Sequence, residues 1–339
     1  MSKQKKLVVG VVGVWNFGKY RRDRMKAAGV FEVVALCDRN QENLNKAMAE
    51  EPGATAYTDF NAMLNHPGLE AIVVSTGADS HAPFGIAAMK KGLHVFIEKP
   101  LCTSMKEVEE LRKMQKKTGL VVGCGHNDCS KSRMMLLAKQ YMEKGKLGVV
   151  TAFEENSSHS GGLEIKPGDW RGLKDKNPGG MLFQCGCHAL HALRYLFGEV
   201  TEVMSMMRYD ANPNTQTADA ANVLLRYKSG LVGTLNCYHT TAYCHELRIF
   251  GTKGNLYFDT QTKRGWFQPR YRGPVEPREE LQLPEAQPYW LEGNVLSWYN
   301  GIRKGTPVYP SLEDGIAAVQ AVFAAEESSK TKKAVAISG

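Results

Sequence analysis

The segment from Gly92 to Pro100 most constrains the fold, because it has the pattern of a buried strand that stops on an acid, a base and a proline. Its apolar residues end at Ile97, and Glu98, Lys99 and Pro100 follow at once. In an open parallel sheet, ligands bind outside the carboxyl ends of the strands. We therefore expect Lys99 to reach a bound ligand, with Glu98 beside it and the proline fixing the turn.

Strands and helices alternate through the first part of the chain. The apolar runs predict strands over 7–12, 31–37, 71–75, 93–97 and 120–124, and the stretches between them predict helices over 19–28, 41–51, 80–91 and 105–117. Alternation of this kind implies βαβ units and a parallel sheet. The uninterrupted apolar runs indicate a sheet covered on both faces. The expected fold class is α/β, beginning with a doubly wound parallel sheet of the Rossmann type.

The second part has a different pattern. Short segments rich in Val, Leu, Tyr and Thr alternate with turn signals, which is typical of a meandering, mostly antiparallel sheet. Five prolines mark a long loop or arm. The expected elements are a helix over 179–197, strands over 202–267, the arm over 268–288, and closing helices over 289–303 and 312–328. We place the domain boundary at residue 124, with a second domain over 125–339.

A glycine-marked turn after the first strand has the layout of a dinucleotide-binding motif. The run is Gly13-Val14-Trp15-Asn16-Phe17-Gly18, and a helix follows it. The glycines permit a tight turn and close helix packing, and the helix amino terminus offers N–H groups to a pyrophosphate. Asp38 ends the second strand, where an acid accepts hydrogen bonds from the adenosine ribose. This pattern predicts NAD binding by residues 1–124; Arg39 could accommodate a 2′-phosphate, so NADP stays an alternative.

Trp15 is the departure from this motif. A glycine at that position normally lets the backbone approach the phosphates. Tryptophan requires a different φ or a displaced turn. The alternative to nucleotide binding is a Rossmann-like domain that has lost its cofactor.

Composition narrows the class of protein. The net charge is +8, but basic and acidic residues are interspersed, whereas nucleic-acid binding needs a concentrated basic face. The apolar run near the amino terminus is too short for a membrane helix and lacks the layout of a secretory signal. The eight cysteines lack paired metal-type spacing, so we expect reduced thiols in the cytoplasm. We expect neither nucleic acid nor a membrane as a partner.

Together these motifs resemble the Gfo/Idh/MocA family of oxidoreductases, which includes glucose–fructose oxidoreductase and inositol dehydrogenases. The resemblance extends over roughly residues 7–254 and is specific only as a set. Its carriers are the glycine turn, Ser75-Thr76 followed by His81, Glu98-Lys99-Pro100, Trp170-Arg171, Gly179-Gly180 with His188, and Phe250-Gly251-Thr252-Lys253-Gly254.

The resemblance implies a Rossmann domain and a carboxyl-terminal α/β domain with a large, mostly antiparallel open sheet. It also implies that residues 125–339 serve substrate binding and oligomerisation, in a homodimer or homotetramer. It also implies that Lys99 positions substrate and nicotinamide and that His188 is the acid/base. Relatives usually carry an aspartate four residues before that histidine and often another three residues after it. Here Gln184 and His191 occupy those positions. This departure puts the usual proton relay in doubt.

The chemistry of these side chains suits oxidation of an alcohol. Removal of a hydride requires loss of the hydroxyl proton to a base with a pKa near working pH, and a histidine such as His188 qualifies. Lys99 can stabilise the alkoxide-like oxygen as a cation. Gln184 can orient a hydroxyl but cannot carry a proton at neutral pH.

Residues 184, 188 and 191 have the i, i+4, i+7 spacing of one helix face. Three interpretations stay open: a substrate-facing stripe, His188 alone with His191 packed in the core, or a metal site that includes His159. We expect no metal, because no acidic or thiolate ligand is placed beside the histidines. His81 could serve the nucleotide or its own helix, and Trp170-Arg171 could contact cofactor or cap a domain interface. Further residues could line the pocket: Asn127, Lys131, Tyr238, His239 and His245.

The favoured function is an NAD(P)-dependent oxidoreductase acting on a secondary hydroxyl of a sugar, cyclitol or glycoside. Lys99 and His188 would be catalytic, with Gln184 and His191 assisting. The alternatives are a nucleotide or sugar sensor without turnover, and a metal-assisted lyase or hydrolase that uses the histidine face.

Overall fold

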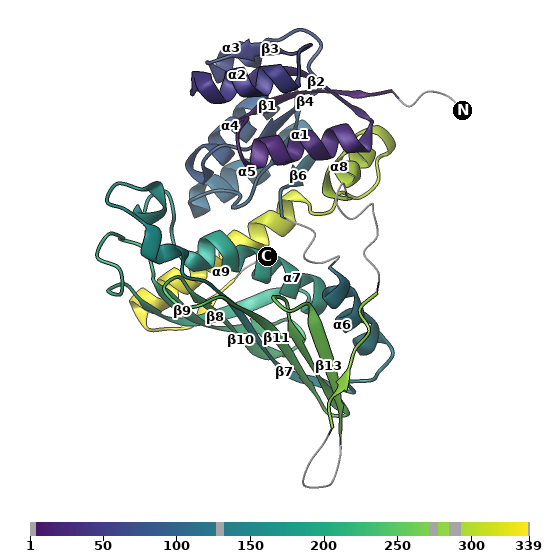
Figure 1. Cartoon of the computed structure of the whole chain (residues 1–339), viewed down its shortest axis with the longest axis vertical. Helices are drawn as coiled ribbons and strands as arrows, with labels where there is room; N and C mark the ends of the chain where they lie inside the picture. The colour runs from purple at the N-terminus through teal and green to yellow at the C-terminus, as the bar shows by residue number, and fades with distance from the viewer. Residues whose placement is uncertain (1–4, 127–131, 271–276, 285–292, 338–339) are drawn as a thin grey trace. The chain divides into compact units, whose positions relative to one another are not determined.

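The structure, a computed structural model, describes residues 5–126, 132–270, 277–284 and 293–337. Its contacts divide the chain into two compact units (Figure 1). The first unit takes residues 1–127 and 288–316, and the second takes residues 128–287 and 317–339. The sequence predicts a single cut at residue 124, so the assignment of residues 288–316 to the first unit differs from that expectation.

The first unit is built on a six-stranded parallel sheet, which confirms the expected doubly wound fold. The strand order is β3-β2-β1-β4-β5-β6. The strands are β1 (Leu7–Val12), β2 (Phe31–Cys37), β3 (Thr55–Tyr57), β4 (Ala71–Val74), β5 (His94–Ile97) and β6 (Val122–Cys124). The helices are α1 (Phe17–Ala28), α2 (Gln41–Glu50), α3 (Phe60–Met63), α4 (Ala78–Lys90), α5 (Met105–Thr118) and α8 (Gly293–Lys304). Only β3 and α3, which are the shortest, are missing from the predicted elements of residues 1–124.

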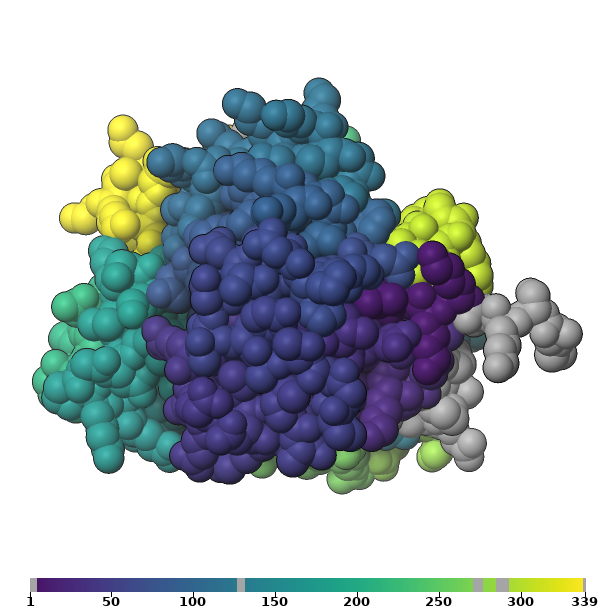
Figure 2. Space-filling model, turned by 90° about the horizontal axis from the view of Figure 1, so that it is seen from above, coloured from purple at the N-terminus to yellow at the C-terminus, as the bar shows by residue number. Residues whose placement is uncertain are grey.

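Helix α8 completes the core of this unit although it is distant in sequence. Trp298 is fully buried, and its ring stacks on Phe31 of β2 with the centroids 6.2 Å apart. Phe96 of β5 meets the same indole edge-on at 5.6 Å. In the space-filling view the yellow-green atoms of α8 adjoin the purple atoms at the start of the chain (Figure 2). Burial of these aromatic rings explains why residues 288–316 fold with the first unit.

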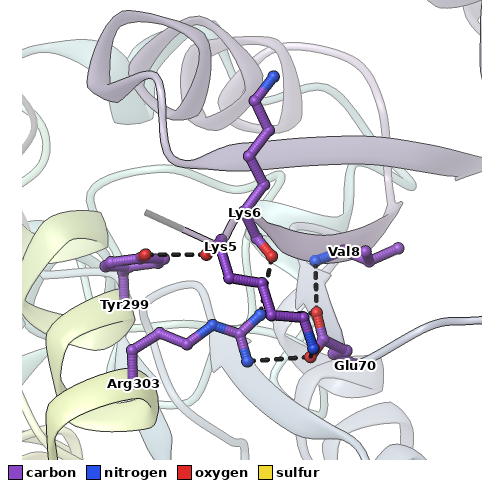
Figure 3. A network of polar contacts seen from close by, with 6 residues as sticks. All are labelled: Lys5, Lys6, Val8, Glu70, Tyr299 and Arg303. Atoms are coloured by element: carbon purple, nitrogen blue, oxygen red, sulfur yellow. Dashed lines mark hydrogen bonds and ion pairs between the residues drawn. The ribbon is translucent and has the colours of Figure 1, made fainter. Parts of the chain in front are cut away.

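Polar contacts fix the same helix to the first strand (Figure 3). Arg303 donates to both carboxylate oxygens of Glu70, at 2.9 and 2.7 Å, and to the carbonyl oxygen of Lys6 at 2.8 Å. The amide of Val8 also donates to Glu70, at 3.0 Å. The hydroxyl of Tyr299 donates to the carbonyl oxygen of Lys5. The bond from Arg303 is the main cause that lowers the pKa of Glu70 to about 2.

The second unit is built on a nine-stranded sheet that is mostly antiparallel, as expected. Its order is β14-β13-β12-β11-β7-β10-β9-β8-β15, and only the β7–β10 pair is parallel. The strands are β7 (Val150–Ser158), β8 (Val200–Arg208), β9 (Ala220–Tyr227), β10 (Val232–Tyr238), β11 (Cys244–Gly251), β12 (Gly254–Asp259), β13 (Arg264–Pro269), β14 (Glu279–Glu280) and β15 (Val335–Ala336). Alternate residues of β9 are buried and exposed, so one face of the sheet is packed and the other is open.

Helices pack on the buried face of this sheet. The helical segments are α6 (Arg133–Glu143), η2 (Gly161–Glu164), η3 (Trp170–Gly172), a π-helical turn η4 (Leu182–Gly186), α7 (Cys187–Phe197) and α9 (Leu312–Thr331), of which residues 317–331 belong to this unit. Phe153 of β7 stacks on Phe197 at the end of α7, with 5.0 Å between the centroids. His159, which follows β7, lies 3.5 Å from Cys185 of η4. The helix therefore runs antiparallel to β7 and lies along it.

The elements of the second part of the chain differ in part from those predicted. Strand β7 and helix α6 are absent from the predicted elements, and the predicted helix over 179–197 begins in the structure at residue 181 with the π turn. The predicted arm over 268–288 and helix over 289–303 fall partly outside the described residues; within the arm, β14 pairs with β13.

We expect Glu70→Gln to destabilise the first unit in a pH-dependent manner. The folded-state pKa lies below the unfolded-state value near 4.5, so the stabilisation is present above that pH and fades as the pH falls toward 2. The loss at neutral pH should be about 2 kcal/mol, after allowance for the partial solvent exposure of the pair. Urea unfolding of the wild type and the variant between pH 7 and pH 3 measures the difference in their unfolding free energies. This difference should become smaller as the pH falls.

The exposed pair Glu42–Lys46, with 2.6 Å between the charged atoms, provides a matched control. Glu42→Gln should leave the unfolding free energy almost unchanged at every pH. A loss of unfolding free energy in Glu70→Gln that does not depend on pH would show that the ion pair is not the source of the effect.

Candidate functional site

The turn between β1 and α1 is too tight for side chains at its two glycines. Gly13 has φ +79°, and a Cβ there would lie 2.5 Å from the carbonyl oxygen of Ser75. A Cβ on Gly18 would lie 1.8 Å from the carbonyl oxygen of Gly13. The amino terminus of α1 is thus packed directly against the strand ends, which is the arrangement that the dinucleotide motif predicts.

Trp15 is accommodated because its neighbour adopts the unusual backbone conformation. Asn16 has φ 50° and ψ −107°, and its side chain makes no capping hydrogen bond to the first turn of α1 among the described residues. The indole of Trp15 is 52% exposed and lies under the ammonium of Lys46, 5.2 Å from the ring centroid. The expected change of φ is therefore found one residue later, at Asn16, whose positive φ is a conformation that residues other than glycine rarely adopt.

Asp38 lies where the motif requires an acid, at the end of β2. Its Oδ2 accepts a hydrogen bond from the amide of Val14 at 3.1 Å, and its Oδ1 accepts one from Asn40 at 2.9 Å. The carboxylate is therefore held beside the glycine turn. Arg39 is exposed next to it. A fixed carboxylate here repels a 2′-phosphate and favours NAD.

The residues after β4 add polar groups to the same edge. The hydroxyl of Ser75 is buried and has no hydrogen-bond partner among the described residues. Thr76 is bonded through its hydroxyl to Ser80 at 2.7 Å. His81 is buried, and its two ring nitrogens lie 2.9 Å from the carbonyl oxygen of Thr76 and 2.7 Å from that of Pro100. Burial lowers the pKa of His81, and the ring connects the turn after β4 to the turn after β5.

Glu98 is buried and forms an ion pair inside the first unit. Its carboxylate is 3% exposed and forms an ion pair with Arg21 of α1, which is itself fully buried. The second oxygen of Glu98 accepts from the amide of Lys99 at 3.3 Å. Lys99 is half-buried, and its ammonium lies 5.4 Å from the centre of the Phe17 ring. Glu98 can hold Lys99 in place or contact a ligand; the structure shows it bonded to the amide of Lys99, and its contact with a cofactor stays a prediction.

Arg21 is the residue of this edge that the sequence analysis does not identify. It donates to the side chain of Asn294 at 3.1 Å and to the carbonyl oxygen of Gly125 at 2.8 Å. The available signal is positional: Gly18, Arg21 and Met25 share the buried face of α1 at helical spacing. An arginine inside such a stripe indicates a buried ion pair.

In the second unit, Trp170 and Arg171 form one exposed element in η3. The guanidinium of Arg171 lies 4.7 Å from the centre of the Trp170 ring, and its charge is paired with Asp169 at 3.5 Å. Trp170 is 40% exposed. Both expected roles, contact with cofactor and capping of an interface, stay predictions.

The candidate catalytic residues lie on the π turn and on α7. Gln184 belongs to the π turn, while His188 and His191 belong to the α-helix that continues from it. Because a π-helix bonds residue i to residue i+5, the angular offset from Gln184 to His188 differs from the α-helical one that the sequence predicts. Gln184 and His188 are half-buried, and His191 is 1% exposed. Insertions of this kind frequently occur at functional sites.

Three further histidines lie at neighbouring strand ends of the nine-stranded sheet. His159 accepts at Nδ1 from the amide of Gly161 at 2.9 Å, so its Nε2 carries the proton and points at Cys185. Burial, with His159 nearby, lowers the pKa of His239 to about 4. His245 stacks on Tyr243 with 4.4 Å between the centroids, and burial lowers its pKa. These imidazoles are therefore uncharged near neutral pH.

Of the other pocket candidates, Tyr238 lies elsewhere. The hydroxyl of Tyr238 donates to Asn222 at 2.7 Å on the open face of the sheet, away from the histidines. Asn127 and Lys131 lie outside the described residues. Within the described ranges, no group of three or more His, Cys, Asp or Glu side chains has the arrangement of a metal site.

The structure also describes most of the cysteines and the helices that the sequence predictions concern. Cys37, Cys102, Cys237 and Cys244 are free thiols, and burial raises the pKa of Cys37 to about 12. Cys129 lies outside the described residues. None of the helices in the described ranges combines the length and the hydropathy that a membrane crossing requires.

Comparison with known proteins decides the family. Residues 7–126 match the oxidoreductase family with an NAD-binding Rossmann fold, and residues 135–257 match the GFO/IDH/MocA C-terminal domain. The two matches follow one another along the chain. The protein belongs to the Gfo/Idh/MocA family of oxidoreductases.

Relatives span nearly the whole of this oxidoreductase. A myo-inositol 2-dehydrogenase of Thermotoga maritima is 25% identical, and the match covers 96% of this chain and 97% of that protein. A scyllo-inositol 2-dehydrogenase (NAD(+)) of Bacillus subtilis is 26% identical over 74% of this chain and 73% of the relative. A solved structure of levoglucosan dehydrogenase with NADH and levoglucosan has a TM-score of 0.87 at 20% identity, covering 99% of this chain and 100% of that one. The last similarity shows the shared fold.

The residues present fit the NAD that the family implies. The glycines let the amino terminus of α1, which can bind a pyrophosphate, pack against the ends of β1 and β4. Asp38 is held where the adenosine ribose of a dinucleotide binds. The unsatisfied hydroxyl of Ser75 supplies a donor and acceptor at the same edge. In this oxidoreductase those groups would hold the cofactor, which supplies a hydride acceptor when bound.

We expect Ser75→Ala to weaken NAD without destabilising the enzyme. Removal of a buried hydroxyl that has no partner among the described residues should leave the melting temperature unchanged or raise it slightly. Loss of one hydrogen bond to the cofactor should raise the NAD Kd by roughly two- to tenfold. Calorimetric titration of NAD and thermal melts of the two apo proteins test this pair of effects. A lower melting temperature with an unchanged Kd would assign the hydroxyl to the fold.

Proposed function

We propose that this oxidoreductase transfers a hydride between NAD and a secondary hydroxyl or ketone of a sugar, cyclitol or glycoside. The observation that carries the proposal is the cofactor edge of the first unit, where the glycine turn, Asp38 and the half-buried Lys99 follow strands β1, β2 and β5 of one parallel sheet. Relatives named inositol and levoglucosan dehydrogenases support this class of substrate.

The proposed chemistry assigns a role to each side chain. Lys99, as a cation, stabilises the negative charge that develops on the reacting oxygen. His188 accepts the hydroxyl proton during oxidation and returns it during reduction. Gln184 orients a neighbouring hydroxyl through its amide. His191, which is buried, supports the helix face from within or takes part in proton transfer.

The histidines at the strand ends are suited to bind the remaining hydroxyls of a polyol. A neutral imidazole has one donor and one acceptor, which matches a hydroxyl group in either role. His239 stays neutral over the physiological range because its pKa is lowered to about 4. We therefore propose that His159, His239 and His245 contribute to substrate selection.

The first experiment identifies the nucleotide and then the alcohol. Freshly purified protein is denatured, any released nucleotide is identified, and NAD and NADP are titrated into the remainder. Bound or micromolar NAD supports the proposal and leads to a screen with myo-inositol, scyllo-inositol and levoglucosan. Failure of both nucleotides to bind would mean that Trp15 closes the site, and the sensor function would then replace the proposed activity.

Lys99→Ala and His188→Ala should each lower kcat by roughly 100- to 10,000-fold, because each removes a group that acts in the transition state. NADH affinity should stay within about threefold of the wild type. Steady-state rates with the alcohol found in the screen, together with NADH fluorescence titration, separate the two effects. Full activity in either variant would remove the role assigned to that residue.

We further propose that the open face of the nine-stranded sheet joins two copies of the chain, and that the enzyme works in the cytoplasm, where its thiols stay reduced. Met204, Met206 and Leu224 are 41%, 75% and 46% exposed, and Met204 pairs directly with Leu224 across β8 and β9. An exposed apolar cluster on a sheet face favours association.

Met206→Glu should convert the oligomer to a monomer, because it buries a charge in the proposed contact. Light scattering coupled to size exclusion reports the mass. Met105→Glu, on a methionine of the first unit with the same 41% exposure as Met204, should leave the mass unchanged. A wild-type protein that runs as a monomer would contradict the proposal.

A further inference from the structure

The ammonium of Lys99 lies over the face of an aromatic ring from the dinucleotide turn. Phe17, the first residue of α1, is 39% exposed, and the Lys99 nitrogen lies 5.4 Å from its ring centroid. This separation is within the range of a cation–π interaction. Two residues that are 82 positions apart in sequence (99 − 17) therefore meet at the cofactor edge.

The backbone of each partner is fixed, so the contact is built into the fold. Phe17 lies between Asn16, with φ 50°, and Gly18, where no Cβ fits. Its ring meets Tyr20 edge-on at 6.5 Å. These constraints fix the start of α1, and the Lys99 ammonium lies over the face of this ring.

The backbone of Lys99 is held indirectly by the same helix, α1. Its amide donates to Glu98, and Glu98 pairs with Arg21 one turn after Phe17 in α1. Pro100, on the other side of Lys99, is bonded through its carbonyl oxygen to His81 at 2.7 Å. Helix α1 thus presents the ring and also determines where the lysine stem begins.

The electrostatics explain why an aromatic ring is useful here. The amino terminus of α1 carries the positive end of the helix dipole, which disfavours a nearby ammonium before an anionic cofactor binds. The negative face of the Phe17 ring offsets this effect. At exposed sites such a contact changes the population of one side-chain position by roughly two- to fivefold.

We propose that Phe17 is a positioning residue, which holds the Lys99 ammonium above its ring so that the cation is already in place when cofactor and substrate bind. The proposal rests on the proposed catalytic role of Lys99. It assigns the aromatic residue of the turn to the reaction through Lys99, separately from any contact with the nucleotide.

A spectroscopic experiment tests the contact without any substrate. Reductive methylation of the full-length apo protein with isotope-labelled formaldehyde keeps the charge of each lysine and labels it. The Lys99 signal is identified by its loss in Lys99→Arg. A ring face above the amine predicts an upfield methyl signal in the wild type, the loss of that shift in Phe17→Leu, and its retention in Phe17→Tyr. An unshifted Lys99 signal in the wild type would overturn the contact.

Turnover with NAD and the alcohol from the screen tests the positioning role. Phe17→Leu should lower kcat by roughly three- to tenfold, with the NAD KM within twofold, and Phe17→Tyr should restore kcat. Phenylalanines with successively more ring fluorines at position 17 should lower kcat stepwise, because fluorine removes the negative ring face at nearly constant size. Phe84→Leu, which removes a ring stacked on Phe60 in the same unit, is the matched control and should leave kcat unchanged.

Failure of the two proposals can be told apart. If Lys99→Ala is inactive while the substitutions of Phe17 leave kcat unchanged, Phe17 has no positioning role and the proposed function stands. If Lys99→Ala is fully active, the assignment of Lys99 falls, and the positioning role falls with it. A rise in the NAD KM alone would assign Phe17 to the nucleotide and overturn the inference.

Discussion

The buried ion pair between Arg21 and Glu98 is the contact on which the ligand edge of the first unit depends. Arg21 lies between the rings of Tyr20 and Phe96, at 5.1 and 5.0 Å, and its remaining donors reach Asn294 and the carbonyl oxygen of Gly125. It thereby ties α1, the end of β5, the end of β6 and α8 to one guanidinium. Loss of either charge would leave the other uncompensated, at a cost of about 3–5 kcal/mol. A contact that is costly to break in this way keeps the glycine turn and Lys99 at a constant separation.

Much of this unit follows from its sequence, because its signals are local. Apolar runs bounded by glycine, Asp38 at a strand end and the Glu98-Lys99-Pro100 turn each predict a feature that the structure contains. Helix α8 could not be assigned to this unit in the same way. Its burial depends on Trp298 meeting Phe31, a contact across 267 positions (298 − 31) that no local pattern encodes.

The second unit shows the same limit in another form. Strand β7 contains Glu154, Glu155 and Asn156 in succession, which is not an apolar run, yet it lies in the middle of the sheet. It is stable there because one face is open to solvent and only alternate residues need to be apolar, as Phe153 is. Burial raises the pKa of Glu155, which alternates with Phe153 along the strand, well above its usual range. The π turn at Gln184 is likewise invisible to a periodicity argument that assumes α-helical spacing.

The replacement of acids by Gln184 and His191 changes how the proposed chemistry would be shared. A carboxylate near His188 would favour the imidazolium form, whereas an amide does not. In the proposed mechanism, stabilisation of the reacting oxygen by Lys99 would then supply the larger part of the lowering of the barrier. Electrostatic stabilisation depends on a fixed position, since a cation that must first move into place contributes less. If Lys99 has the proposed role, the contacts that fix it, with Glu98 through its amide and with Phe17 through its ammonium, would therefore matter most at this step.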